Sequence, residues 1–172
     1  MTAQEFKGIV ISQQATMYRV ALRITGNHDD ACDALQETLV RLWSNRDKLD
    51  CAEDRIAYCV GSLKKQCISL MRSRKEFCGT EVLVNEESDI SAADTLTEQR
   101  DMLSVVRAAI RSLPDSQRRV MELSVFSQCD NSEIHEITGM TEANIRAALS
   151  RGRKRIREIF SNISNINDNE HH

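Results

Sequence analysis

Apolar residues in the first part of the chain repeat at the three- and four-residue spacing of amphipathic helices. The first predicted helix runs from Met17 to the stop at Gly26-Asn27. A second is capped by Asp29 or Asp30 and ends near Trp43, and a third begins near Glu53. The inward positions are Val20, Ala21 and Ile24, then Ala31, Leu35, Leu39 and Leu42, then Ile56, Val60, Leu63, Cys67 and Leu70. Three such helices can close one small core.

The helical pattern fades between Glu76 and Asp101, where acidic residues outnumber basic ones. Structureless loops longer than about 15 residues are uncommon inside compact domains, so this stretch favours a solvated linker over a loop within one domain. We therefore predict a domain at residues 1–76, an acidic linker at 77–101, a second domain at 102–163 and a disordered tail at 164–172.

Helical spacing returns in the second half with Leu103, Val106, Ile110 and Leu113, followed by Pro114 at a helix start. The pattern continues on the new helix with Val120 and Leu123 and with Met121 and Val125. Asn131 or Ser132 then caps a short helix, Gly139 makes a turn, and Thr141 caps a long helix. The apolar positions of these last two helices are Ile134, Ile137, Ile145, Leu149, Gly152, Ile156 and Ile159. Two helices separated by a short turn with Gly predict a helix-turn-helix.

Composition agrees with an all-α fold, because the chain has one Pro, six Gly and 4% aromatic residues among 172. The six cysteines form no Cys-x-x-Cys pair and have no His at a zinc-ligand spacing, so we expect no metal site. No stretch reaches the roughly 20 apolar residues of a membrane span. We expect a cytoplasmic protein with reduced thiols, no membrane insertion and no cofactor. Glu170-His171-His172 could be the trace of a purification tag.

The exposed side of the last helix carries side chains suited to DNA. Glu142, Asn144 and Arg146 offer groups that read base edges in a major groove, and Ala143 and Ala147 leave room for a thymine methyl. Arg151, Arg153 and Lys154 lie further along, where cations hold phosphates. The alternative is an ordinary solvated basic face, but the preceding cap and turn favour DNA contact.

The other two helical surfaces have less specific patterns. The third helix presents a mixed cationic face that can lie along a nucleic-acid strand, made of Lys64, Lys65, Ile68, Ser69 and Arg72. The second helix presents a stripe that would repel DNA and is typical of a protein-docking surface, made of Asp33, Gln36, Glu37 and Val40. The net charge of -3 argues against indiscriminate nucleic-acid binding.

A search for catalytic motifs finds no phosphate-binding Gly-rich loop, no His-Glu-x-x-His and no nucleophile elbow. We therefore expect that the protein is not an enzyme.

The ordered set of motifs resembles the extracytoplasmic-function class of bacterial sigma factors. The first part contributes Ala21-Leu22-Arg23-Ile24-Thr25-Gly26-Asn27, Asp29-Asp30-Ala31, Asp33-Ala34-Leu35-Gln36-Glu37-Thr38 and Leu42-Trp43. The second contributes Ile110-Arg111-Ser112-Leu113-Pro114, Gln117-Arg118-Arg119-Val120, Glu133-Ile134, Ile137-Thr138-Gly139-Met140, Asn144-Ile145-Arg146 and Ser150-Arg151-Gly152-Arg153-Lys154-Arg155-Ile156.

The resemblance implies two small helical domains, a promoter-melting helical bundle and a helix-turn-helix domain. It implies that Asp33, Gln36 and Glu37 lie on the helix that docks core RNA polymerase. It also implies that the third helix and the preceding loop, Asn45 to Arg55, engage promoter DNA near position -10, and that the helix from Glu142 reads the -35 element. Members of this class are often held inactive by an anti-sigma factor.

Two other functions fit parts of the pattern. A stand-alone helix-turn-helix regulator would bind operator DNA by itself, as a dimer on a palindrome. A helical adaptor would bind polymerase or another protein without touching DNA.

Overall fold

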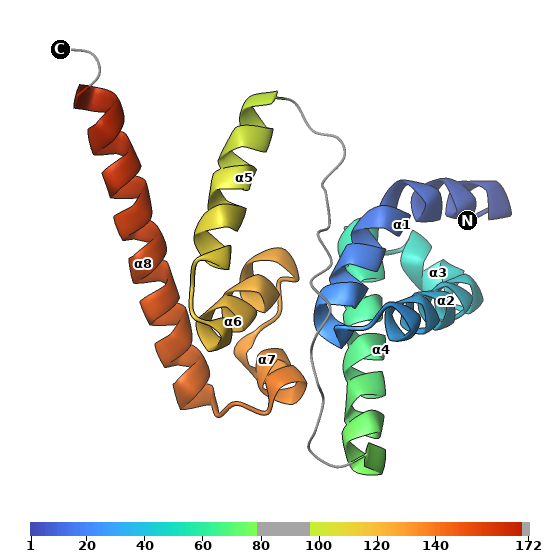
Figure 1. The fold of residues 1–172 in the computed structure, drawn as a ribbon. Helices are drawn as coiled ribbons and strands as arrows, with labels where there is room; N and C mark the ends of the chain where they lie inside the picture. Colours follow the sequence, from blue (N-terminus) through green and yellow to red (C-terminus); the bar gives the residue numbers. More distant parts are fainter. Residues whose placement is uncertain (79–96, 170–172) are drawn as a thin grey trace. The chain divides into compact units, whose positions relative to one another are not determined.

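The computed structural model of the protein describes residues 1–78 and 97–169, and all regular secondary structure within these ranges is helical (Figure 1). The chain divides into two compact units, with the division between Ile90 and Ser91, outside the described residues. The predicted all-α class and two-unit organisation are confirmed. Within the described ranges no helix is long and apolar enough to span a membrane, and no three His, Cys, Asp or Glu side chains converge as metal ligands.

The N-terminal unit contains four helices, namely α1 (Ala3–Thr25), α2 (His28–Ser44), the short α3 (Arg46–Asp50) and α4 (Arg55–Cys78). The three long helices pack against one another around one core, and α3 connects α2 to α4 (Figure 1). Met17 and Ile24 of α1, Leu63 and Met71 of α4, and Leu49 of α3 are all fully buried in this unit. The sequence pattern did not predict α3, whose single buried side chain, Leu49, attaches it to the bundle.

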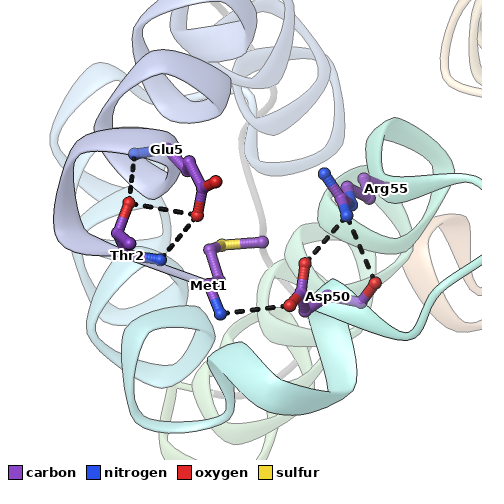
Figure 2. Close-up of polar contacts among 5 residues, drawn as sticks. All are labelled: Met1, Thr2, Glu5, Asp50 and Arg55. Atoms are coloured by element: carbon purple, nitrogen blue, oxygen red, sulfur yellow. Dashed lines mark hydrogen bonds and ion pairs between the residues drawn. The ribbon is translucent and has the colours of Figure 1, made fainter.

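Helix α1 begins about four turns before the first predicted apolar position because Thr2 and Glu5 form a capping box. The Glu5 amide donates to Thr2 Oγ1 at 3.3 Å, and the Thr2 amide donates to Glu5 Oε2 at 2.7 Å (Figure 2). Beside the box, the Met1 ammonium donates to Asp50 Oδ2 at 3.0 Å, and Arg55 donates to Asp50 Oδ1 at 2.8 Å (Figure 2). Asp50 thus joins the start of α1 to the end of α3 and the start of α4.

Helix α2 is capped by Asn27, whose Oδ1 accepts the Asp30 amide at 3.1 Å. The prediction that Asp29 or Asp30 is the cap is wrong. Gly26 ends α1 with φ at 69°, so Asn27 is the first residue free to take the extended conformation of a cap. Ile56, predicted to be buried, is 48% exposed because it lies in the first turn of α4.

The C-terminal unit contains α5 (Thr97–Arg111), α6 (Asp115–Phe126), α7 (Asn131–Thr138) and α8 (Glu142–Asn169). Its core includes Ile110, Val120, Leu123, Ile134 and Ile145, each at most 1% exposed. Helix α8 packs against α5, α6 and α7 (Figure 1). The second helix of the predicted helix-turn-helix thus contacts every other helix of this unit.

Several predicted details of this unit differ from the structure. Helix α7 is capped by Asp130 rather than Asn131 or Ser132, because Asp130 and Glu133 form a capping box. Leu103 and Val125, predicted on inner faces, are 43% and 45% exposed. Helix α5 begins at Thr97, inside the stretch predicted as linker.

Helix α8 also differs from its prediction, because it runs to Asn169, through most of the predicted disordered tail. No Gly or Pro follows Gly152, so the sequence holds no strong signal that ends this helix.

Candidate nucleic-acid interface

The turn between α7 and α8 is held by a dense set of local hydrogen bonds. Gly139 has φ at 73°, a left-handed conformation that glycine takes without steric cost, and its amide donates to the His135 carbonyl at 2.8 Å. His135 Nδ1 lies 2.7 Å from the Met140 carbonyl oxygen. Thr141 Oγ1 accepts the Asn144 amide at 3.3 Å, which confirms the predicted cap of α8. These contacts orient the first turns of α8 relative to α7.

Seven of the eight side chains predicted to contact DNA on α8 are exposed, and Ala147 is half-buried. The exposed ones are Glu142, Ala143, Asn144, Arg146, Arg151, Arg153 and Lys154. Arg146 Nη1 lies 3.4 Å from Glu142 Oε2, an exposed pair one helical turn apart. Because exposed pairs of this kind contribute little to stability, Arg146 can exchange Glu142 for another partner at small cost.

A cation-rich groove runs beside α8 where the helix meets the start of α7. Its volume is about 520 Å³. Four cations line it, and no carboxylate does. The lining residues are Asn131, Arg146, Leu149, Ser150, Arg153, Lys154 and Arg157. A concave surface with this charge suits a phosphate-bearing strand.

The exposed face of α8 is wider than this groove. At about 100° per residue, Arg151 lies about 140° around the helix from Arg146. Asn144 shares the side of Arg151 rather than the groove side. Arg146 and Arg153 therefore lie on one flank of Ala143 and Ala147, and Asn144 and Arg151 lie on the other. Lys154 lies between the two flanks.

Four groove residues were not among the predicted DNA contacts, namely Asn131, Leu149, Ser150 and Arg157. Arg157 follows Arg153 by four residues and Lys154 by three, so helical spacing alone could have identified it. Asn131 belongs to another helix, and only the packing of α7 against α8 brings it to the groove.

The cationic face of α4 is narrower than predicted, because Ile68 is 8% exposed and belongs to the core. Placing Ile68 on the exposed face was wrong. Both α1 and α2 pack against α4, so the buried face of α4 spans about half of its circumference instead of one stripe. Lys65, Ser69 and Arg72 remain exposed, and Lys64 is half-buried.

The predicted docking stripe on α2 is exposed along its length. Asp33, Gln36 and Glu37 are exposed, and Val40 is 66% exposed. Glu37 pairs with Arg41 at 3.5 Å, again between exposed side chains. Trp43 follows Val40 by one helical turn, and its ring centroid lies 5.2 Å from that of Phe6, with the two rings at 64°. The Arg46 guanidinium carbon lies 4.9 Å from the Trp43 ring centroid. An exposed apolar residue on the same stripe as two acidic side chains suits a protein partner with basic groups.

Comparison with known families matches both units. Residues 10–77 match the model of Sigma-70 region 2, and residues 103–156 match that of Sigma-70 region 4. The chain belongs to the sigma-70 family, in the extracytoplasmic-function class. The predicted docking stripe and the α4 face of this sigma factor lie within region 2, and the cation-rich groove lies within region 4.

Curated relatives of this sigma factor cover nearly its whole length. The extracytoplasmic-function RNA polymerase sigma factor SigW of Bacillus subtilis is 26% identical, over 89% of this chain and 87% of its own. The RNA polymerase sigma-E factor of Streptomyces avermitilis is 28% identical, over 90% of this chain and 84% of its own. Both alignments include the linker, so the two regions occur in the same order in the relatives.

A solved structure shares the fold. The sigma factor RpoE of Bartonella quintana, crystallised with the anti-sigma factor NepR, matches with a TM-score of 0.50 and 21% identity. The match covers 92% of this chain and 98% of the other. The helical architecture of the two units is therefore that of a known sigma factor.

Proposed function

We propose that this sigma factor binds core RNA polymerase through α2 and selects promoters through α4 and α8. The observation that carries the proposal is the pairing, in one chain, of an acidic and apolar stripe with a cation-rich helix-turn-helix groove. Acidic residues repel DNA, so the stripe suits a protein partner, while the groove suits phosphates. Polymerase then supplies affinity, and the sigma factor supplies promoter choice.

On region 4, the first turns of α8 and its later turns have different tasks. Glu142, Asn144 and Arg146, in the first turns, read base edges of the -35 element. Arg151, Arg153 and Lys154 hold phosphates, and the groove extends this contact to Arg157. Ala143 and Ala147 allow α8 to approach the bases closely.

On region 2, Lys65, Ser69 and Arg72 of α4 contact DNA near position -10, with Lys64 at the edge of the surface. The segment from Asn45 to Arg55, which includes α3 and ends at the first residue of α4, contacts the same region of the promoter. Opening the duplex needs no catalytic residue, because capture of unstacked bases offsets a cost of a few kcal/mol. Promoter opening by this protein therefore needs no enzymatic activity of its own. We expect the protein to act in the cytoplasm.

An anti-sigma factor is a further partner, as in the complex of the Bartonella sigma factor with NepR. Such a partner would compete with polymerase for the exposed stripe on α2.

Run-off transcription with purified core polymerase tests the proposal, on a library of bacterial promoter fragments. We compare the wild type with an Asp33→Ala, Glu37→Ala double variant and with Glu158→Ala, which removes an exposed acid from α8. The wild type and Glu158→Ala should give promoter-specific transcripts, and the double variant should lose them together with core binding in a pull-down.

Two outcomes would contradict the proposal. Tight binding of the isolated protein to a palindromic site without transcripts would favour a stand-alone regulator. Core binding that is unchanged by Arg146→Ala and Arg151→Ala, with no DNA-dependent activity at all, would favour a helical adaptor.

A further inference from the structure

A chain of three polar side chains lies at the junction of α1 and α2. Tyr18 Oη lies 2.7 Å from His28 Nδ1, and their rings meet edge to face at 5.9 Å. The other nitrogen of His28, Nε2, lies 3.7 Å from Cys32 Sγ, one helical turn along α2. The Cys32 thiol thus contacts one nitrogen of the His28 imidazole, and Tyr18 contacts the other.

This geometry is that of an assisted nucleophile. A thiol becomes reactive when a neighbouring base takes its proton, and the base acts best when another group fixes its orientation. When His28 Nδ1 carries the ring proton and donates it to Tyr18 Oη, the lone pair of Nε2 faces the Cys32 thiol. Cys32 is half-buried rather than fully enclosed.

The other four cysteines whose side chains the structure describes differ from Cys32 in burial or in their contacts. Cys59, Cys67 and Cys129 are buried, and burial raises the pKa of the Cys59 thiol. Cys51 is exposed on the loop after α3, and no hydrogen bond among the described residues joins its thiol to an imidazole. Cys51 is therefore an internal control for exposure without a base.

We propose that Cys32 is a modification site for thiol–disulfide exchange with small disulfides, with His28 as the proton acceptor and Tyr18 as its positioning residue. Cys32 Sγ loses its proton to His28 Nε2 and attacks one sulfur of the disulfide. A new S–S bond forms as the old one breaks, and the leaving thiolate takes the proton from His28. The products are one mixed disulfide and one free thiol.

The surroundings of Cys32 select the charge of the disulfide. Asp29 precedes Cys32 by three residues on α2 and Asp33 follows it directly, and both are exposed. Two carboxylates this close favour a cationic disulfide such as cystamine over an anionic one such as glutathione disulfide.

An adduct on Cys32 would affect the docking stripe. Gln36 follows Cys32 by four residues, so the two side chains are neighbours on the surface of α2. A bulky group on Cys32 would lie beside Asp33 and Gln36 and would hinder the binding of polymerase to the stripe. This consequence rests on the proposed function of the stripe, whereas the exchange reaction does not.

The reaction is tested on the full-length protein with cystamine, using peptide mapping by mass spectrometry to follow each of the six cysteines separately. Cys32 should react about tenfold faster than Cys51, a modest share of what a general base can contribute. His28→Ala should remove the difference while leaving the Cys51 rate unchanged, and added imidazole should partly restore it. Tyr18→Phe should alter the pH profile of the Cys32 rate alone.

Equal rates at Cys32 and Cys51, or a Cys32 rate unaffected by His28→Ala in a variant with unchanged circular dichroism, would overturn the proposal. Glutathione disulfide should react more slowly at Cys32 than cystamine does, and the reverse order would overturn the predicted charge selection.

The effect on docking is measured by core-polymerase pull-down of cystamine-treated wild type and cystamine-treated Cys32→Ser. Loss of binding in the wild type alone supports obstruction of the stripe. Full binding by the modified wild type would overturn that consequence. Absence of binding before treatment would instead count against the proposed function, so the two failures are distinguishable.

Discussion

Gly152 of α8 lies so close to Met121 of α6 that a β-carbon at position 152 would stand 2.8 Å from Met121 Cγ. Leu113 Cδ1 would be 3.5 Å away. Because Met121 is itself only 3% exposed, its side chain has little room to move aside. The close packing of α8 on α6 therefore depends on the missing side chain.

Gly152→Ala should destabilise the C-terminal unit. Overpacking a core costs about 1–3 kcal/mol, and the better helix propensity of Ala offsets only about 1 kcal/mol of that. The matched control is Gly61→Ala within α4, where a β-carbon would meet nothing within 4 Å. Gly61→Ala should stabilise its unit by about 0.5–1 kcal/mol.

Urea unfolding measures both effects, and the one tryptophan, Trp43, reports on the N-terminal unit alone. Circular dichroism follows both units, so a shift in its transition without a shift in Trp43 fluorescence locates the loss in the C-terminal unit. Equal gains in stability from the two glycine substitutions would show that the contact with Met121 is not tight.

Asp130→Ala should destabilise α7 by about 0.5–2 kcal/mol, because it removes a cap. The Glu133 amide would lose its acceptor, Asp130 Oδ1, at 2.8 Å. The reciprocal bond at 2.9 Å, which the backbone amide of residue 130 donates to Glu133 Oε2, would remain possible. Ser132→Ala, at an exposed position in the same turn, should change stability by less than about 0.5 kcal/mol. The comparison uses thermal unfolding, and a larger effect at Ser132 would contradict the observed cap.

Ile68→Ala and Lys65→Ala should separate packing from DNA binding on α4. Ile68 is buried, so its truncation should cost about 2–5 kcal/mol of stability. Lys65 is exposed, so its truncation should leave stability nearly unchanged and reduce promoter opening. Unfolding curves and permanganate footprinting measure the two properties. A stable Ile68→Ala protein would place that side chain outside the core.

Arg146→Ala should alter preference at the -35 element, whereas Arg153→Ala should weaken binding to all promoters. Arg146 lies in the second turn of α8, near base edges, and Arg153 lies two turns further along. Loss of one phosphate contact flattens the salt dependence of log K by about one unit. Holoenzyme titrations on promoter variants at several salt concentrations measure both effects, and equal losses on all promoters from both changes would refute the division.

Asp50→Asn should reduce the stability of the N-terminal unit at neutral pH but not in acid. The hydrogen bond and charge of the Met1 ammonium, with the charge of Arg55, lower the pKa of Asp50 from its ordinary value of 3.8. Because the folded-state pKa is lowered, the stabilisation is present above about pH 4 and is lost as pH falls through the folded value. Trp43-monitored melting curves of wild type and variant should therefore converge in acid. A constant difference at every pH would contradict this origin.

The sequence by itself predicted most of the fold, because helix periodicity, caps and turn glycines are local properties. Gly26 and Gly139 end helices where expected, Thr141 caps α8, and the helix-turn-helix occupies its predicted place. The exposed charges on α8 and α2 could also be predicted from the sequence, because the spacing of apolar residues in an amphipathic helix identifies the positions that face solvent. The family motifs are likewise local runs of residues.

Only the tertiary structure decided how wide each buried face is and which distant residues meet. Ile68 is buried because two helices, α1 and α2, pack against α4. The spacing of apolar residues within α4 does not show how many other helices pack against it. Asn131 reaches the groove of α8 through packing of α7, and Asp50 meets Met1 across 49 positions of the chain. Cys32 and His28 are one turn apart in the sequence, but Tyr18, which holds the imidazole, comes from another helix. Such contacts depend on how helices pack, and that packing is a property of the whole unit rather than of any segment.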